Sequence, residues 1–355
     1  MRRAIYILFM LATLLWCGCE RRPLEEMSNT HYMRVYINEN IPNVTTGLYN
    51  ANYKRPRYTQ PEVLRIILTD LTTGEAVAER FLRQRGEDER GTYYEGWVIV
   101  DPGRYGVIAY NFDTETTIVN DSYHYHDAKA TTNEIAYYLR DKIISRANAD
   151  VAANERIVYD PDHLFSASCG EIYIPFVNHI DTITTLDGDY LTAHTLVKTY
   201  YMQVRVQGIQ YATSSVGLLT GMSGSSWLST RAMDAEDNVT LYFEMQPGIS
   251  TPTGIVRGEN EDVMTIYTSF NTFGKLPNEQ NKLEITFDFL TTYGVPYSET
   301  LDITELFYTP EGRDNQWLLI DHVIRIPDPP PPTEGGGGFA PSVDDWEDVH
   351  TDIII

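Results

Sequence analysis

The chain has few cysteines for its 355 residues. The three are Cys17, Cys19 and Cys169. The first two lie at the end of an N-terminal apolar segment, which leaves Cys169 alone for the body of the protein and predicts a fold without an internal disulfide. A lone cysteine at the entrance to an apolar stretch is more often a small core residue than a nucleophile, so we interpret Cys169 as structural.

Positive charge is also scarce. Against 50 Asp and Glu residues the chain has 27 Lys and Arg, which gives a formal net charge of −23. A polyanionic surface repels phosphate backbones and anionic lipid head groups, so the composition argues against nucleic acid as a partner. The acidity either attracts Ca²⁺ or keeps an exported protein soluble, and the second is the simpler interpretation.

Long hydrophobic runs are missing. An apolar stretch over residues 4–16 follows Arg2 and Arg3, and it is shorter than the ~20 residues that a membrane-spanning helix needs. Residues 1–18 are therefore predicted to be a signal peptide. The small Gly18 before Cys19 resembles the cleavage site of bacterial lipoproteins, whereas Cys17 follows the bulky Trp16. We expect an acylated Cys19 to anchor the protein in the membrane; an ordinary secretory signal is the alternative.

The dominant periodicity is two, which indicates β-strands and a mainly all-β fold. A first β-sandwich domain is predicted over residues 31–190, after an N-terminal linker at 19–30. Its strand candidates are residues 31–37, 63–68, 76–83, 92–100, 104–112 and 172–177. Asp101-Pro102-Gly103 gives a turn between two of them. Residues 131–149 have better helix formers, and we predict a short helical or irregular insertion there.

A second β-sandwich domain is predicted over residues 191–326, with the boundary near residues 188–194. Its strand candidates begin near residue 196 and continue at 216–220, 239–245, 263–273, 282–289, 296–303 and 317–326. Short strands at this spacing, separated by Gly, Asn and Pro turns, are typical of a sandwich.

The C-terminal region differs in composition from both domains. Residues 327–342 form a Pro- and Gly-rich linker, stiff at its start and flexible after it. Residues 343–355 follow as an acidic and apolar segment of strand type, with one face formed by Val349, Thr351, Ile353 and Ile355. An exposed apolar strand needs a sheet edge to pair with, so we expect this segment to add to a sheet, either of its own chain or of a neighbouring subunit. A disordered acidic tail is the alternative.

Several short motifs carry a family resemblance. They are residues 199–209 (TYYMQVRVQGI), 218–225 (LLTGMSGS), 272–274 (TFG), 101–105 (DPGRY) followed by Tyr110-Asn111, and 343–346 (VDDW) after the glycine run. In these residues the chain resembles fimbrillin-like lipoproteins of gut and oral anaerobes, in an uncharacterised branch related to the anchor subunits of type V fimbriae. The resemblance implies two tandem transthyretin-like sandwiches, outer-membrane lipidation and, for true fimbrial members, assembly by donor-strand exchange.

Stalk subunits of that group lose their first strand to an arginine-specific protease. Here Arg34 lies inside the first strand candidate, and Arg55 and Arg57 follow in a Pro-containing loop. None is a convincing processing site. A chain that keeps its lipid and its first strand is expected to be an anchor or a free-standing surface protein, facing the periplasm or the cell exterior.

Candidate catalytic patterns are weak, and we predict no enzyme, no cofactor and no metal. His124 and His126 lack further ligands nearby for a metal. Ser223, within Gly221-Met222-Ser223-Gly224-Ser225, departs from the Gly-x-Ser-x-Gly elbow of hydrolases. The leading function is therefore a structural or adhesive role at the cell surface.

A glycan-binding surface lipoprotein of a polysaccharide-uptake system is the alternative function. The chain has 25 Tyr and five Trp, and aromatic rings that are exposed together can stack on sugars, although such rings more often fill sandwich cores. The observation that separates the two functions is whether Trp97, Trp227, Trp317 or Trp346 form an exposed platform.

Overall fold

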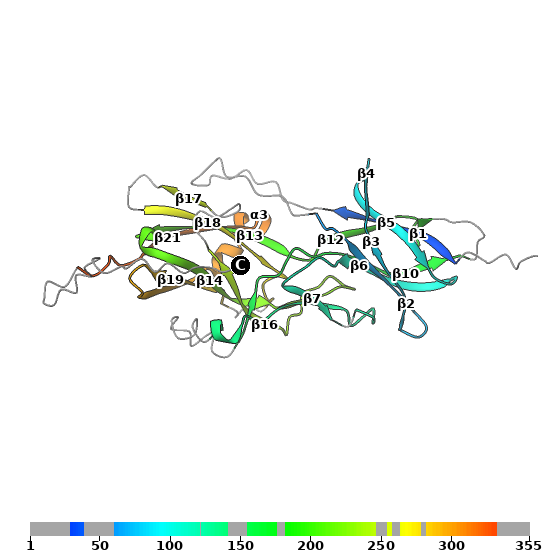
Figure 1. Ribbon diagram of the computed structural model, residues 1–355, viewed down its shortest axis with the longest axis horizontal. Helices are drawn as coiled ribbons and strands as arrows, with labels where there is room; N and C mark the ends of the chain where they lie inside the picture. Colours follow the sequence, from blue (N-terminus) through cyan, green and yellow to red (C-terminus); the bar gives the residue numbers. More distant parts are fainter. Residues whose placement is uncertain are drawn as a thin grey trace, which may run out of the picture.

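The computed structural model describes residues 29–38, 60–120, 122–140, 155–175, 182–245, 254–257, 263–277 and 282–331. Over these residues the protein is built mainly of β-strands, arranged as two units along one long axis (Figure 1). The named helical elements are short: η1 (Ile209–Tyr211), η2 (Thr304–Phe307) and α3 (Pro310–Asn315). Within the described part, no helix has the length and apolar character to cross a bilayer. The prediction of a mainly all-β fold is confirmed.

The first unit is a single rolled sheet. Its strands are β1 (Thr30–Asn38), β2 (Leu64–Asp70), β3 (Ala76–Leu82), β4 (Gln84–Asp88), β5 (Gly91–Ile99), β6 (Gly103–Asn111), β10 (Phe165–Ile174), β11 (Thr182–Ile183) and β12 (Leu191–Thr195). They pair in the order β3-β2-β6-β10-β12-β1-β5-β4, with β11 beside β1. Only β11 and β12, which run parallel to β1, depart from the antiparallel pairing of this sheet.

The core of the first unit lies between the two halves of the rolled sheet. Alternate residues of the interior strands point inward, as Leu64, Ile66 and Leu68 of β2 do, and they meet Met33 and Val35 from β1. All five side chains are fully buried. This alternation is the period-two pattern of the sequence, and it explains why the strands of this unit with apolar alternation were predictable.

The second unit is a sandwich of two separate sheets. One contains β20 (Pro296–Asp302), β19 (Glu284–Thr291), β14 (Ala212–Ser223), β16 (Asn238–Glu244) and β9 (Arg156–Tyr159), in that order. The other contains β17 (Gly254–Arg257), β18 (Val263–Thr272), β13 (Lys198–Gln207) and β21 (Trp317–Arg325). A large apolar cluster fills the space between them, with Phe270, Phe287 and Phe289 among its fully buried rings.

A small third sheet lies where the two units meet. It pairs β7 (Thr117–Asn120), β8 (Lys129–Thr132) and β15 (Ser225–Trp227), so strands from both halves of the sequence share it. An apolar cluster beside it combines Tyr110 and Tyr125 from the first half with Leu228 and Phe273 from the second. The junction is therefore a packed core rather than a flexible linker.

Strand pairing divides the chain at a different place from the boundary expected between residues 190 and 191. Strand β12 pairs with β10 and β1 and so belongs to the first unit. Strand β9 precedes that boundary by some thirty residues, yet it pairs in parallel with β16 of the second unit. Each unit therefore depends on a segment that the sequence alone assigns to the other, because backbone pairing over long separations leaves no local signal.

The helical insertion expected at 131–149 is only partly correct. Thr131 and Thr132 belong to strand β8, residues 133–136 are not helical, residues 137–140 form one helical turn, and residues 141–149 lie outside the described residues. The sequence analysis also missed helix α3. That helix follows standard capping: the Thr309 side chain accepts a hydrogen bond from the Gly312 N–H at 3.0 Å, and Pro310 occupies the first turn.

Candidate functional site: the first strand and the junction between the units

Strand β1 lies inside the sheet of the first unit rather than at its edge. On one side it pairs antiparallel with β5 over seven positions; on the other it pairs parallel with β12 over four and with β11 over two. Met33, Val35 and Ile37 point into the core. Removal of this strand would leave unpaired backbone groups and an apolar groove along the sheet.

The outward side of β1 is fixed by a charged and aromatic network around Arg34. Its Nε and Nη2 atoms donate to Glu95 Oε2 at 2.9 and 2.7 Å, and Nη1 lies 3.3 Å from Asp88 Oδ2. The guanidinium carbon lies 3.8 Å from the centroid of the Tyr93 ring. Tyr36 donates its hydroxyl to Asp88 at 2.7 Å, and this bond holds the pKa of the Asp88 carboxyl below its ordinary value. Side chains thus tie β1 to β5 and β4.

The Tyr93 ring fits into this network because β4 carries a glycine opposite it. Gly86 pairs with Tyr93 across the two strands. A Cβ atom added at residue 86 would lie 2.3 Å from the ring. The ring therefore contacts the bare backbone of β4, which no other residue at position 86 would permit.

These contacts decide how accessible Arg34 is to a protease. Its backbone lies in a strand with neighbours on both sides, and its side chain is held by two carboxylates. Cleavage after Arg34 requires the strand to leave the sheet first, so the folded first unit protects this bond. The other two arginines considered from the sequence, Arg55 and Arg57, lie outside the described residues.

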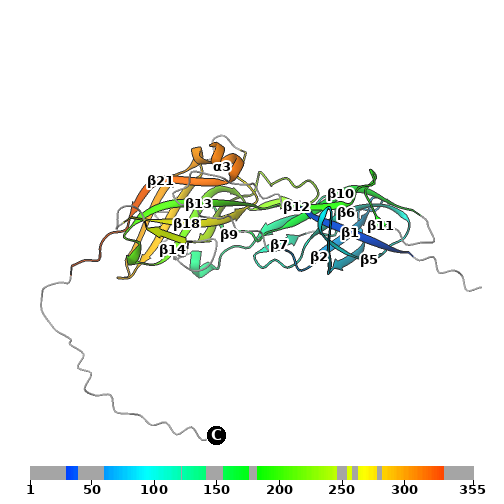
Figure 2. The ribbon, with the colours of Figure 1, turned by 90° about the horizontal axis from the view of Figure 1, so that it is seen from above.

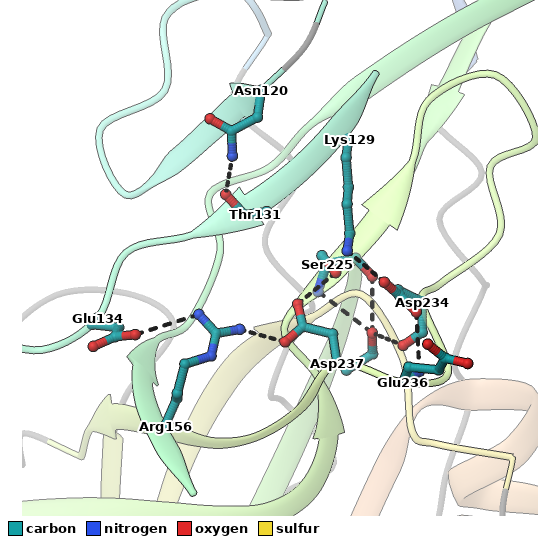
Figure 3. A network of polar contacts seen from close by, with 10 residues as sticks. Asn120, Lys129, Thr131, Glu134, Arg156, Ser225, Asp234, Glu236 and Asp237 are labelled. Atoms are coloured by element: carbon teal, nitrogen blue, oxygen red, sulfur yellow. Dashed lines mark hydrogen bonds and ion pairs between the residues drawn. The ribbon is translucent and has the colours of Figure 1, made fainter. Parts of the chain in front are cut away.

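A second polar network lies at the junction between the two units (Figure 3). Lys129 on β8 forms an ion pair with Asp234, and Arg156 on β9 forms one with Asp237. Asp237 also accepts a hydrogen bond from Ser225 Oγ at 2.6 Å. The hydrogen bond from Lys129 holds the pKa of the Asp234 carboxyl below its ordinary value. Both cations come from the first half of the chain and both carboxylates from the second.

Asp160, directly after β9, is a half-buried acid at the same junction. Its Oδ2 accepts a hydrogen bond from the Asn271 backbone N–H at 3.2 Å, and its own N–H donates to the Tyr242 carbonyl oxygen at 3.2 Å. Burial raises the pKa of Asp160 to about 7, and the nearby carboxylates of Asp162 and Glu244 act in the same direction. The junction therefore contains a carboxyl group that the folded state prefers to keep protonated.

Asp160→Asn should stabilise the protein above neutral pH and do little at acid pH. The folded-state pKa is raised, so the contribution of Asp160 to stability is present below its unfolded pKa and is lost as the pH rises through about 7. The neutral amide keeps an acceptor oxygen for Asn271 and carries no charge to bury. We expect a gain on the order of 2 kcal/mol at pH 8 over wild type and almost none at pH 4.

Urea unfolding of both proteins at pH 4, 6 and 8 measures this difference. Asp187→Asn, at an exposed turn position, is the matched control and should change stability equally at each pH. A difference between Asp160→Asn and wild type that stays constant across the series would contradict the assignment of a raised pKa.

The residues that carry the anchoring and strand-donation predictions lie outside the described residues. They are Cys19 at the N-terminus and Val349, Thr351, Ile353 and Ile355 at the C-terminus. Both assignments remain predictions from the sequence. What the structure adds is the position of the neighbouring elements: the first unit, which follows Cys19, lies at one end of the long axis, and the described residues after β21 leave at the other end (Figure 2).

The tryptophans considered as a sugar platform do not come together. Trp97 on β5 is half exposed and contacts Tyr32, Trp227 on β15 lies beside Lys129, and Trp317 at the start of β21 is buried. These three belong to three different sheets, and Trp346 lies outside the described residues.

The residues of the weak catalytic patterns have structural or solvent-exposed positions. His124 and His126 flank Tyr125, which is buried at the junction. Ser223 Oγ donates to the carbonyl oxygens of Ser225 and Asp234, so it is bound to the backbone. Across the described ranges, no group of three or more His, Cys, Asp or Glu side chains is placed to hold a metal ion.

Cys169 is half-buried beside the first core, at an irregular point inside β10. Its place in the middle of the strand corrects the expected position at a strand entrance. Strand pairing begins at Phe165, earlier than the apolar stretch that the sequence shows.

Glu95, Asp88 and Tyr93 are the functional residues that the sequence analysis missed. Tyr93 and Glu95 lie on the outward side of a strand that was predicted, where polar and aromatic residues alternate with the core positions. Asp88 lies on β4, an exposed and charged edge strand with no apolar alternation. Charge on an edge strand prevents unwanted pairing. It also removes the alternation of apolar and polar residues from which a strand is recognised in a sequence.

The geometry defines a class of protein. It is a mainly β chain of two joined units, and its first strand, β1, is an interior strand of the first unit. A family model described as a domain of unknown function, DUF5119, matches residues 61–244. The match covers more than half of the chain, so the chain belongs to this family. The matched segment extends across the junction into both units.

Two individual proteins extend the comparison. The chain is 23% identical over 356 residues, 96% of this chain and 95% of the relative, to a Bacteroides ovatus protein that is provisionally named fimbrium anchoring subunit Fim4B. A crystal structure from Bacteroides ovatus, described provisionally as an adhesin, has a TM-score of 0.52 and 19% identity, covering 89% of this chain and 99% of that one. The similarity to this crystal structure shows a shared fold. Together they confirm the resemblance predicted from the sequence.

Proposed function

We propose that this protein is a surface lipoprotein that serves as an anchoring or accessory subunit of a fimbrium, held in the outer membrane by a lipid on Cys19. The relative Fim4B is named for anchoring, and the likeness extends over both units. The role is therefore assigned to the whole chain. It is structural and adhesive, and the network around Arg34 holds strands together rather than performing chemistry.

The observation that carries this proposal is the position of β1. The strand begins at Thr30, eleven residues after Cys19, and it lies between β5 on one side and β11 and β12 on the other. A lipid on Cys19 would thus be covalently continuous with an interior strand of the fold. A chain that kept this strand would stay attached to the membrane, whereas loss of the strand would separate the fold from its lipid.

The geometry of β1 also suits a subunit under tension. Inter-strand hydrogen bonds lie perpendicular to the strands in an antiparallel pair, so a pull along β1 loads the bonds to β5 together rather than one after another. The ion pairs of Arg34 with Glu95 and Asp88 resist the same displacement. A fimbrium that is pulled from outside would transmit its load through this strand to the lipid.

The opposite end of the molecule would face the neighbouring subunit. The described chain leaves the second unit after β21, remote from the first unit (Figure 2). The Pro- and Gly-rich linker and the strand-type segment 343–355 follow there in the sequence. We infer that this segment adds to a sheet of the next subunit, so that the protein joins the membrane at one end and the fimbrium at the other.

Cys19→Ala should release the protein from the membrane fraction without unfolding it. Acyl chains provide the anchor, since each buried methylene contributes about 0.8 kcal/mol, and the substituted residue lies before the first strand. Membrane fractionation followed by immunoblotting measures the release, and circular dichroism of the soluble form checks the fold. Cys169→Ala is the matched control and should remain in the membrane fraction.

Full membrane retention of the Cys19→Ala protein would contradict the anchoring proposal. Release by Cys17→Ala but not by Cys19→Ala would instead move the acylation site two residues upstream. Co-purification of other fimbrial subunits with the wild-type protein from detergent-solubilised outer membranes tests the fimbrial assignment separately.

A further inference from the structure

Aromatic side chains line the outer face of the first unit's sheet across β12, β1 and β5. Tyr36 lies between Tyr190 and Tyr93, with ring centroids 5.4 and 5.6 Å apart. Farther along the same strands, the Tyr32 and Trp97 rings meet edge to face at 4.7 Å. Trp97 is 51% exposed. These five rings form one face, which we call the aromatic face.

A cleft of about 420 Å³ opens at the Tyr190 end of the aromatic face. Tyr36 and Tyr190 line it together with Asn38, Arg90 and Asp189. The guanidinium of Arg90 lies 5.1 Å from the centroid of the Tyr190 ring. Asn38, Arg90 and Asp189 are exposed, so the cleft offers an aromatic wall beside an amide, a guanidinium and a carboxylate that are free to meet a solute.

We propose that the aromatic face and its cleft bind a neutral polysaccharide, with one hexose in the cleft and further sugars along the row of rings. This binding activity goes beyond the anchoring role, and it would let the protein attach to a glycan directly. The volume of the cleft falls within the ~300–1,000 Å³ of small-ligand pockets. Its lining matches the two sides of a sugar, since C–H groups pack on the negative face of a ring while hydroxyls bond to amide, carboxylate and guanidinium groups.

The length of the aromatic face favours an oligosaccharide over a single sugar. Tyr93 and Trp97 are four residues apart on β5, which separates them by about 13 Å along the strand. Tyr32 and Tyr36 repeat this spacing on β1. Tyr36 is itself buried, so the rings that can contact different sugars of one chain are Tyr190 in the cleft and the half-exposed Trp97 at the far end.

Charge selects a neutral ligand and disfavours a protein partner. The chain carries a net charge of −23, and carboxylates accompany the cations of this face: Arg34 is paired with Glu95 and Asp88, and Asp189 lines the same cleft as Arg90. A polyanionic glycan gains nothing from such a surface. Protein interfaces bury an apolar centre from which charge is depleted, whereas Arg34 and its carboxylates occupy the middle of this face.

Native electrophoresis of the detergent-solubilised full chain in gels that contain a polysaccharide tests the proposal. The probes are soluble starch, xylan and glucomannan, with polygalacturonate as the polyanion. We expect at least one neutral probe to retard the wild-type protein. Tyr190→Ala and, separately, Asp189→Ala should weaken that retardation roughly tenfold. Tyr173→Ala, at an exposed tyrosine on β10, is the matched control and should bind as wild type does.

Each outcome decides the proposal. Asp189 is exposed, so its variant keeps the test valid even where Tyr190→Ala fails to fold. The proposal would be overturned if no neutral probe retarded the wild-type protein, or if polygalacturonate alone did so. It would also be overturned if both cleft variants were retarded as strongly as wild type. Loss of co-purifying fimbrial subunits in the same variants, with no polysaccharide binding, would identify the face as a protein interface instead. Membrane release of Cys19→Ala is independent of these results, so failure here leaves the anchoring proposal standing.

Discussion

Arg34→Met should lower the free energy of unfolding of the full chain by about 2–4 kcal/mol. Methionine keeps much of the packing along β1 but removes the positive charge, and Glu95 is then left nearly buried without its bidentate partner. An uncompensated buried charge costs more than the ion pair itself contributes. The partial exposure of Arg34 places the expected value below that of a fully buried pair. Urea unfolding followed by circular dichroism measures the loss.

A surface ion pair elsewhere in the same sheet supplies the control for Arg34→Met. Arg104 on β6 lies 3.1 Å from Glu171, and both side chains are well exposed. Arg104→Met should cost no more than about 0.5–1 kcal/mol. Addition of Glu95→Gln to Arg34→Met should restore part of the loss, because the neutral amide is cheaper to bury. Equal losses for the two arginine variants would show that the network does not hold β1.

Protection of the bond after Arg34 against proteolysis is a separate test, made on the wild-type protein. In the wild-type protein an arginine-specific protease should leave the bond after Arg34 intact, since β1 must leave the sheet before it can be cut. Wild-type protein that is cut at Arg34 under native conditions would mean that β1 opens readily, and the proposed anchoring through this strand would then fail.

Deletion of residues 343–355 should abolish assembly with other fimbrial subunits while it leaves the melting temperature of the isolated protein nearly unchanged. In the sequence, the Pro- and Gly-rich linker 327–342 separates this segment from β21, and such a linker gives it reach toward another subunit. The apolar positions Val349, Thr351, Ile353 and Ile355 are therefore expected to be buried in a partner. Burial of two isoleucines there would contribute on the order of 3–6 kcal/mol to association before ordering costs.

Two measurements read out this deletion: thermal unfolding of the purified protein and co-purification of subunits from the outer membrane. Replacement of three of the five acidic residues, Asp344, Asp345 and Glu347, by neutral amides is the matched control, because it changes the charge and keeps the apolar positions. A lower melting temperature of the deletion variant would show that the segment pairs with a sheet of its own chain. An equally stable protein that still assembles would contradict strand donation altogether.

The sequence predicted those parts of the fold whose signal is local. Strands β2, β5, β6, β13 and β18 are rich in apolar and aromatic residues, and each was expected within one or two residues of its observed bounds. Strands β4, β9 and β12 were missed. They are short or exposed, and their pairing partners lie far away in the sequence, so their stability comes from the sheet rather than from their own residues.

The candidate site was likewise predictable only where its signal is local. Arg34 was recognised as part of a strand, but its partners Glu95 and Asp88 lie 61 and 54 residues away, and no spacing rule connects them. The sugar-binding alternative was considered from the count of aromatic residues and sought in tryptophans. The cleft instead lies between Tyr36 and Tyr190, which only the parallel pairing of β1 with β12 brings together.

By itself, the sequence determined that the chain is acidic and mainly β and that its motifs resemble a known family. Composition and the period of two are properties of neighbouring residues, so no folded structure is needed to read them. Tertiary structure alone decided that β1 is an interior strand, that β9 and β12 cross the expected boundary, and that tyrosines meet on one face. Register between distant strands sets all three, because a shift of one residue would turn every outward side chain toward the core.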